Sequence, residues 1–341
     1  MSTKTPYAGD RPLLSVVITS YAPERLGNLQ ELVDSLQAQS YGNLEIVFVG
    51  ERYPSLIPEF LRLCERKGLQ NVTTVFNHGT PGLSPARNLG AQNARGEIIA
   101  FIDDDAVAFP DWGAAIVETF AEHQDGIGVT GPAYPLWEDD AMAWFPEEFL
   151  WMLSCRRREQ NESGSVRKVR NAWGVNMAFR REAFACCQFS ETFIGGNQGM
   201  PGGAKAGLLG DDTDFCIRLR ERTRRPIYYC PAIRVYHQVP KSRLTNRSIR
   251  RRSFWEGYTK AVLAKLYRGE ESLEIDLSVE RALLRRILLH LLPAAIKQLP
   301  TDPLLAAKKL QLIAVALSHT ALGYASAKVP LLGPWFAKRY A

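Results

Sequence analysis

Residues 86–110 read ARNLGAQNARGEIIAFIDDDAVAFP, and this stretch contains the features that decide the fold. An amphipathic segment at 85–94 favours a helix, and the apolar run at 97–102 is typical of a buried strand. Three consecutive aspartates, Asp103, Asp104 and Asp105, follow that strand directly. Charges that repel one another at the end of a buried strand indicate a bound cation, and a solvated acidic turn is the ordinary alternative.

The segments before this stretch repeat the same alternation. Strands are predicted at 13–20, 44–49, 72–76 and 97–102, and helices at 26–39, 56–67 and 85–94. Such alternation favours a mostly parallel sheet with helices on both faces, so the predicted fold class is α/β. After about residue 115 the alternation weakens, and a stretch rich in tryptophan, proline and glycine suits irregular structure around a binding cleft.

Ligand-binding residues of such sheets lie just beyond the carboxyl ends of the strands. Thr19, Tyr21 and Glu24 lie at this point of the first strand, and Glu51 lies at the end of the second. The three aspartates lie at the end of the fourth. Carboxylate oxygens are the ligands that Mg²⁺ and Mn²⁺ prefer, so the sequence predicts a divalent-cation site there.

Length, charge and cysteine content bound the remaining possibilities. A chain of 341 residues is long enough to bury one large core or two smaller ones. Its formal net charge of +6 is modest and argues against wholesale coating of nucleic acid. The six cysteines show no CxxC pair and no zinc-like spacing, and the start of the sequence lacks a signal-peptide pattern. These features predict a reducing, cytosolic compartment.

Three further blocks accompany residues 86–110, namely SVVITSY at 15–21, GVNMAFRRE at 174–182 and GDDTDFCIRL at 210–219. Together they resemble the family-2 glycosyltransferases, inverting enzymes of the GT-A fold. The core pattern of that family is ARN, then A-x-GE, then an aspartate-rich turn and a proline. Within the family, the chain resembles the glucosyl-dolichyl-phosphate glucuronosyltransferases and related bacterial polysaccharide glycosyltransferases.

The resemblance implies roles for five aspartates. Asp103 and Asp105 match the first and last positions of a D-x-D motif, which binds the nucleotide sugar and its Mn²⁺ or Mg²⁺. Asp104 occupies the variable position and is assigned to the nucleotide sugar. Asp212 matches the general base, and Asp211 stands where a glutamate is more usual. Helix N-capping is the alternative role for Asp211 and Asp212.

The resemblance is less direct on the nucleotide side. The family's Asp-Asp/Asn-Gly-Ser after the second strand reads Gly-Glu-Arg-Tyr at 50–53 here. Glu51 is therefore expected to contact the base, with Thr19, Tyr21 and Glu24 beside the donor.

Two further residues are carried over from the family. Arg87 is expected to hold the ribose, base or phosphate of the donor, and a surface ion pair is the alternative. His237 is expected to complete the metal site or to touch the diphosphate, and a structural histidine is the alternative.

The predicted organisation has a GT-A catalytic domain at 1–250 and a helical, membrane-associated region at 251–341. Nucleotide-sugar binding is assigned to about 13–115 and the acceptor side to about 116–250. A basic run at 241–252 precedes an amphipathic helix at 282–292, in which leucines alternate with arginines. This composition suits a helix lying on an anionic membrane, whereas residues 310–327 are only a marginal candidate to span one.

The predicted function is metal-dependent, inverting sugar transfer from a nucleotide-diphosphate donor, expected to be a UDP-sugar. The acceptor is a hydroxyl of a polyprenyl- or dolichyl-phosphate-linked molecule or of a polysaccharide, and no nucleic acid takes part. The protein is expected at the cytoplasmic, inner face of the cell membrane, bound peripherally. The alternatives are a sugar nucleotidyltransferase, and a non-catalytic basic scaffold or nucleic-acid-binding protein.

Overall fold

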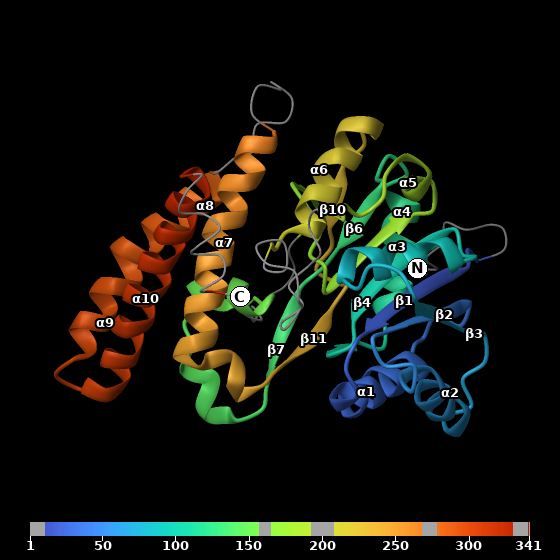
Figure 1. Cartoon of the computed structure of the whole chain (residues 1–341), viewed down its shortest axis with the longest axis horizontal. Helices are drawn as coiled ribbons and strands as arrows, with labels where there is room; N and C mark the ends of the chain where they lie inside the picture. Colours follow the sequence, from blue (N-terminus) through green and yellow to red (C-terminus); the bar gives the residue numbers. More distant parts are fainter. Residues whose placement is uncertain (1–10, 157–164, 192–207, 268–277, 330–339, 341) are drawn as a thin grey trace, which may run out of the picture. The chain divides into compact units, whose positions relative to one another are not determined.

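The computed structural model describes residues 11–156, 165–191, 208–267, 278–329 and 340 (Figure 1). The chain divides into two compact units, each assembled from separated segments. Unit 1 comprises Met1–Tyr134, Arg158–Ile194 and Asp211–Gln238, and unit 2 comprises Pro135–Arg157, Gly195–Gly210 and Val239–Ala341. The functional boundary predicted at residue 250 stays a prediction, because compactness alone does not report which part binds a substrate.

Unit 1 is built on an eight-stranded sheet with the order β3-β2-β1-β4-β9-β6-β10-β8. The strands are β1 (Leu14–Ser20), β2 (Leu44–Glu51), β3 (Val72–Asn77), β4 (Ile98–Asp103), β6 (Gly128–Thr130), β8 (Arg167–Val169), β9 (Asn176–Arg180) and β10 (Ile227–Tyr229). The first four strands run parallel to one another. Strand β9 is antiparallel to both of its neighbours, and β10 is parallel to β6 and antiparallel to β8.

The two faces of this sheet bury alternate residues of the same strands. On one face, Ile18 and Phe48 pack in a core with α1 (Leu26–Gln37), α2 (Leu56–Arg66) and α4 (Trp112–Glu122). On the other face, Val17 and Phe101 pack with α3 (Leu83–Asn93), α5 (Glu182–Cys186) and α6 (Asp211–Thr223). Successive side chains of a strand point to opposite faces, so a sheet covered on both sides requires continuous apolar runs. The predicted α/β fold is confirmed.

A second sheet of three strands, ordered β5-β11-β7, follows the aspartates. Its strands are β5 (Ala106–Ala108), β7 (Ala133–Trp137) and β11 (Val235–Val239). Strands β5 and β11 are antiparallel, with Ala106 opposite His237. This register brings a histidine that lies 132 residues after Asp105 in the sequence back to the end of β4.

Unit 2 is mainly helical, and the predicted C-terminal helices are present. Its elements are η2 (Asp140–Trp144), η3 (Glu147–Leu153), η5 (Lys241–Leu244), α7 (Asn246–Leu266), α8 (Ser278–Arg286), the π-helical turn η6 (Ile287–Leu291), α9 (Leu292–Gln298) and α10 (Pro303–Lys328). Phe149, Ile249 and Ile313 contribute to its core. The helix predicted at 282–292 is present as part of a continuous helical segment, in which residues 287–291 form the π-helical turn.

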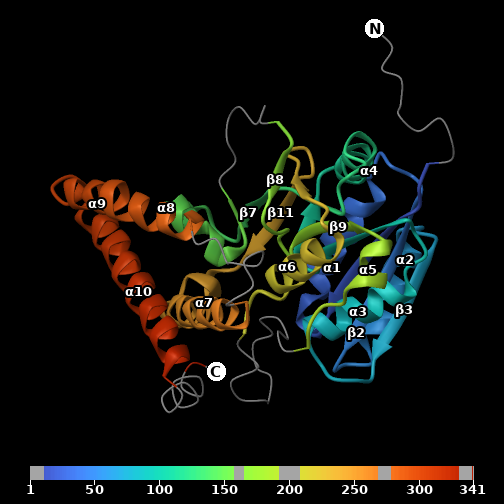
Figure 2. The same cartoon turned by 90° about the horizontal axis from the view of Figure 1, so that it is seen from above.

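Two glycines allow α7 and α10 to cross closely, and Figures 1 and 2 show these helices side by side. A Cβ atom on Gly257 would lie 1.9 Å from the carbonyl oxygen of Thr320, and one on Gly323 would lie 1.9 Å from that of Phe254. By length and composition, α10 is the one helix of the described residues apolar enough to cross a membrane. The glycine contacts show that one side of α10 packs against protein.

Candidate active site

The carboxyl ends of β1 and β4 form the base of the site. Asp103 is the last residue of β4 and is paired in register with Thr19 of β1. Asp105 follows in the turn, and the register of β5 and β11 places His237 against it. The His237 Nε2 atom lies 3.0 Å from Asp105 Oδ1, and both side chains are buried. The sheet therefore brings together the three residues predicted to hold a metal.

The arrangement of these three side chains fits a divalent cation. One ligand atom from each of Asp103, Asp105 and His237 lies within 4.8 Å of the others. Ligands about 2.1 Å from an octahedral ion are separated by roughly 3.0 Å when adjacent and roughly 4.2 Å when opposite. Two carboxylates suit both Mg²⁺ and Mn²⁺, and an imidazole ligand suits a transition metal such as Mn²⁺ better than it suits Mg²⁺. The donor set thus supports a metal site, with the identity of the ion left open.

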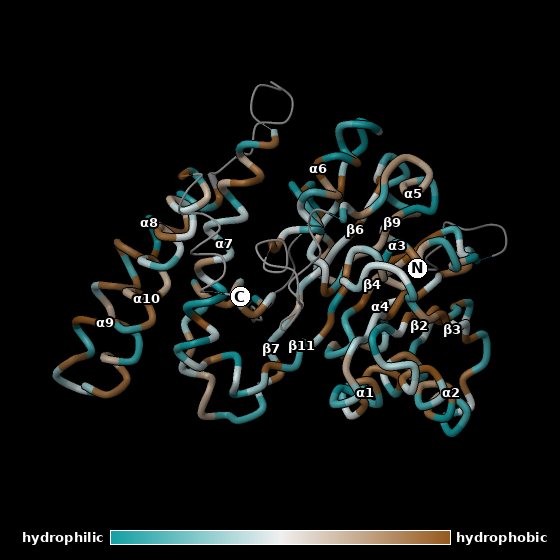
Figure 3. Tube along the Cα trace, in the orientation of Figure 1, coloured by the Kyte–Doolittle hydropathy of each residue, from teal (hydrophilic) through white to brown (hydrophobic). Residues whose placement is uncertain are grey.

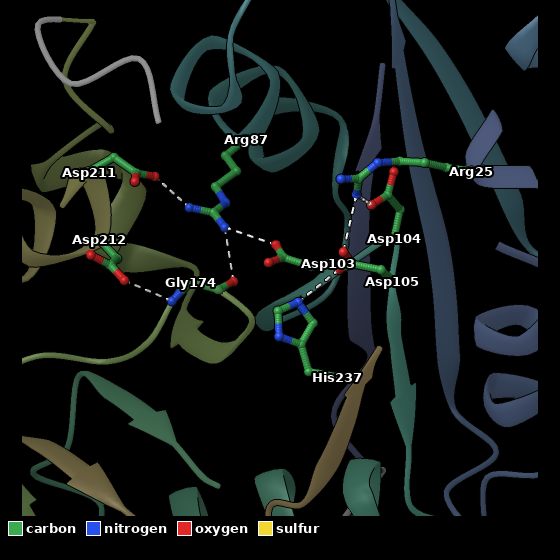
Figure 4. A network of polar contacts seen from close by, with 9 residues as sticks. All are labelled: Arg25, Arg87, Asp103, Asp104, Asp105, Gly174, Asp211, Asp212 and His237. Carbon is green, nitrogen blue, oxygen red and sulfur yellow. Dashed lines mark hydrogen bonds and ion pairs between the residues drawn. The ribbon is translucent and has the colours of Figure 1, made fainter. Parts of the chain in front are cut away.

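The central aspartate points away from this group, toward Arg25 (Figure 4). Asp104 Oδ1 pairs with Arg25 Nη1, and Asp104 Oδ2 accepts a 2.6 Å hydrogen bond from the Ser20 hydroxyl. Burial raises the pKa of Asp104 to about 6, against the opposing effect of Arg25, and repulsion by Asp105 adds to the rise. Burial by itself lowers the pKa of Arg25, but Asp104 and Asp105 raise it by more.

Arg87 connects the aspartates of β4 with those of α6. Its Nη1 lies 2.5 Å from Asp211 Oδ2, and its Nη2 lies 3.2 Å from Asp103 Oδ1 and donates a 2.9 Å hydrogen bond to the Gly174 carbonyl. The side chain is only 3% exposed. The alternative of a surface ion pair is therefore wrong, because this arginine is buried between two groups of carboxylates.

The two aspartates at the start of α6 have different surroundings. Asp211 is buried, and burial raises its pKa to about 6. The positive charge of Arg87 opposes this rise, whereas the charges of Asp212 and Asp103 add to it. Asp212 is partly exposed, and its Oδ2 accepts a 2.9 Å hydrogen bond from the Gly174 N–H. Its Oδ1 accepts a 2.6 Å hydrogen bond from the Thr213 N–H. Asp212 is thus held in one orientation, and Figure 4 shows it on the same side of Arg87 as Asp211.

The residues predicted on the nucleotide side lie along the ends of β1 and β2. Glu51 is buried, and its Oε2 accepts a 2.7 Å hydrogen bond from the Gly82 N–H. Tyr21 lies 4.9 Å from the Arg25 guanidinium carbon and 5.2 Å from that of Arg52, measured from its ring centroid. Thr19 is partly buried, whereas Glu24 is exposed. Base contact by Glu51 stays a prediction, as does donor contact by Thr19, Tyr21 and Glu24.

Three residues of this site had no role assigned from the sequence: Arg25, Ser20 and Gly174. Arg25 ends a short 3-10 helix, η1 (Pro23–Arg25), directly after β1. The available signal was a basic residue shortly after the first strand, because that strand was expected to lie in the same sheet as the strand that ends in three aspartates. Gly174 gave no such signal, because its role depends on the position of Arg87, which belongs to a distant part of the chain.

Known proteins share this architecture. A family model described as Glycosyl transferase family 2 matches residues 15–187. A glucosyl-dolichyl phosphate glucuronosyltransferase of Haloferax volcanii is 32% identical over 312 residues, which cover 91% of this chain and 94% of that protein. The uncharacterized glycosyltransferase EpsJ of Bacillus subtilis is 26% identical over 178 residues, 51% of this chain and 49% of EpsJ.

A solved structure is also similar. It is the mannosyltransferase PcManGT from Pyrobaculum calidifontis in complex with GDP-Man and Mn²⁺, with a TM-score of 0.56 and 19% sequence identity. The similarity covers 98% of this chain and 86% of that one, and at this identity it shows the fold alone.

The matched family region contains β1 to β4, the three aspartates and Arg87, whereas Asp211, Asp212 and His237 of the site lie beyond it. The similarity to the Haloferax protein extends further, through most of both chains. On these grounds the chain belongs to glycosyl transferase family 2 and is a glycosyltransferase of the GT-A fold.

Proposed function

We propose that the protein transfers a sugar from a nucleotide-diphosphate donor, a UDP-sugar, to a hydroxyl of a lipid-phosphate-linked acceptor, with inversion at the anomeric carbon. The observation that carries this proposal is the position of Arg87 between Asp103 and Asp211. One buried guanidinium links the carboxylates that suit a metal to the carboxylates at the start of α6. Donor binding and proton removal are thereby assigned to opposite sides of one site (Figure 4).

The donor diphosphate is assigned to the side of Asp103, Asp105 and His237, which would hold Mn²⁺ or Mg²⁺. When bound there, the cation supplies charge neutralisation for the departing nucleotide diphosphate. Arg87 adds a fixed positive charge at the same edge, and its two ion pairs and one carbonyl contact hold the guanidinium in place. Fixed charges of this kind stabilise developing negative charge without reorganising.

Asp212 is assigned as the general base. Direct displacement at the anomeric carbon requires the acceptor hydroxyl to lose its proton as it attacks, and a carboxylate within hydrogen-bond reach accepts that proton. Asp212 is partly exposed and oriented by two backbone N–H groups, so it is accessible to an acceptor. Asp211 is buried against Arg87 and is better suited to holding that arginine.

The acceptor and the location rest on unit 2 and on the Haloferax relative, whose name gives a dolichyl-phosphate-linked acceptor for that protein. Large apolar side chains are exposed from α8 through η6 and α9 to the first turn of α10: Leu284, Leu288, Leu289, Ile296, Leu299 and Leu304. Exposed basic residues lie among them: Arg281, Arg285, Lys297 and Lys308. Figure 3 shows brown and teal stretches alternating along α9 and α10.

An apolar surface interspersed with positive charge suits the interface plane of an anionic membrane. The protein is accordingly assigned to the cytoplasmic face of the cell membrane, bound peripherally. Such a location gives the site access to a lipid-linked acceptor.

A donor panel tests the proposal. Binding and slow hydrolysis of UDP-glucose, UDP-glucuronate and GDP-mannose are measured by calorimetry and product release, with Mn²⁺, with Mg²⁺ and with excess chelator. At least one UDP-sugar should bind only when a divalent ion is present. Asp105→Asn should abolish this metal-dependent donor binding while the protein stays folded, since the amide keeps the size of the side chain but loses its charge.

The stereochemistry is read from the product formed on a dolichyl-phosphate glucose acceptor, whose new anomeric configuration is assigned by NMR. Inversion is expected. Retention of configuration would rule out the single displacement assisted by Asp212. Tight donor binding that persists in chelator, in both the wild-type protein and Asp105→Asn, would rule out the metal site.

A further inference from the structure

The residue after β2 has an unusual backbone conformation for its type. Arg52 has φ of 66°, in the left-handed region that favours glycine. A side chain with a Cβ atom adopts this region at an energetic cost, and such residues concentrate where a ligand is bound. Arg52 follows the buried Glu51 at the carboxyl end of β2, where ligands of doubly wound sheets bind.

The Arg52 side chain is also incompletely satisfied. Its Nη2 atom is buried and has no hydrogen-bond partner among the described residues. Its guanidinium carbon lies 5.2 Å from the centroid of the Tyr21 ring, which keeps the group close to the aromatic side chain. Buried polar atoms of native proteins are nearly always paired, and a carbonyl group of a ligand beside Tyr21 would supply the acceptor that this donor lacks.

The position of Arg52 identifies which part of a donor it would meet. The metal-binding carboxylates lie at the end of β4, and β1 separates β4 from β2 in the sheet. Neighbouring strands are about 4.8 Å apart, so Arg52 lies roughly two spacings, or about 10 Å, from the diphosphate end. This is about the reach of a ribose and its base. Tyr21, at the end of the intervening β1, lies on the same path.

We propose that Arg52 is a specificity-determining residue that donates a hydrogen bond to a ring carbonyl of the donor's base. The guanidinium offers only donors, so it matches the O4 atom of uracil or the O6 atom of guanine. It opposes the amino group that cytosine or adenine presents at the corresponding position. The inference rests on the proposed function, since it assumes that a nucleotide diphosphate binds at this edge.

The test compares nucleotide diphosphates that differ at one ring substituent. Dissociation constants for UDP and CDP, and for GDP and ADP, are measured by calorimetry with Mn²⁺ on the full chain. The wild-type protein should bind the carbonyl-bearing member of at least one pair about 10-fold or more tightly. Arg52→Met should reduce that ratio to about 3-fold or less by weakening the carbonyl-bearing nucleotide alone.

Arg52→Gly separates this role from folding, because it removes the side chain and relieves the backbone at the same time. Its melting temperature should equal that of the wild-type protein or exceed it by up to about 3 °C, while discrimination between the bases is lost. The matched control is Arg224→Gly. Arg224 follows α6 and also has a positive φ, of 55°, but its side chain is 70% exposed and pairs with Glu221 of that helix. This control should leave every nucleotide affinity unchanged.

The outcomes distinguish the inference from the proposed function. Binding of all four nucleotides without discrimination by the wild-type protein would overturn the inference and leave the proposed function standing. An equal loss of affinity for all four nucleotides in Arg52→Met would also overturn only the inference, since it would indicate that Arg52 contacts the phosphates and not the base. No binding of any nucleotide with Mn²⁺ would overturn both.

Discussion

Gly174→Ala is a small change that should damage the site without unfolding the protein. A Cβ atom at this position would lie 2.8 Å from Nη2 and 3.1 Å from Nη1 of Arg87. Gly174 is not among the described residues with positive φ, so its backbone accepts an alanine. The new methyl group therefore acts on the guanidinium that links Asp103 to Asp211.

The size of the effect follows from these distances. Ordinary contact with a Cβ atom begins at 3.4 Å, so Nη2 must retreat by the difference from 2.8 Å, about 0.6 Å. That movement disturbs its 2.9 Å hydrogen bond to the Gly174 carbonyl and its 3.2 Å contact with Asp103. A misplacement of about 1 Å in a catalytic site costs roughly 100-fold, so we expect kcat/KM to fall about 10- to 100-fold, or roughly 1.4 to 2.7 kcal/mol.

The assay is the metal-dependent transfer rate with the donor found in the panel, alongside the melting temperature. Gly42→Ala is the control, because an added Cβ atom there meets nothing within 4 Å. The same change is also made in an Arg87→Met background, where the clash no longer exists. In that background Gly174→Ala should lower the transfer rate almost no further, since the two changes act through one contact. An undiminished rate in the single variant, or an equal loss in the Arg87→Met background, would refute the reasoning.

Three further predictions concern the base, the counterion and the membrane. Asp212→Asn should keep donor and metal affinity but transfer sugar about 10² to 10⁴ times more slowly, and near-normal turnover would move the base elsewhere. Arg25→Gln should strengthen Mn²⁺ binding, followed by electron paramagnetic resonance, by about 10-fold, because it removes a positive charge that pairs with Asp105 of the metal site, whereas Arg95→Gln, which breaks a similar pair with a buried glutamate at the opposite end of the sheet, should leave it unchanged. Leu284→Gln combined with Leu288→Gln should release the protein from anionic vesicles at low salt without lowering its melting temperature, because both side chains are exposed; retained binding would contradict the membrane surface.

Local pattern was sufficient to place the first four strands of the sheet. β1, β2, β3 and β4 each begin and end within two residues of the predicted strands. Apolar runs of this kind have only one stable arrangement, a sheet covered on both sides, so composition and alternation determine the layers. The helix predicted at 282–292 is present, but the sequence did not indicate the π-helical turn within it, where Ile287 packs in the unit 2 core.

The sequence by itself determined which residues carry charge at the strand ends, and its motifs indicated the family. It could not determine which of three adjacent aspartates would face a metal. That depended on Arg25 and Ser20, which contact the two oxygens of Asp104, whereas Asp103 and Asp105 lie beside His237, with Arg25 also 3.4 Å from Asp105 Oδ2. Nor could it show that Arg87 is buried between β4 and α6, because its partners lie 16 and 124 residues away. Strand periodicity is a local property of the chain, whereas the pairing of buried charges is decided only when the sheet and its helices bring distant segments into contact.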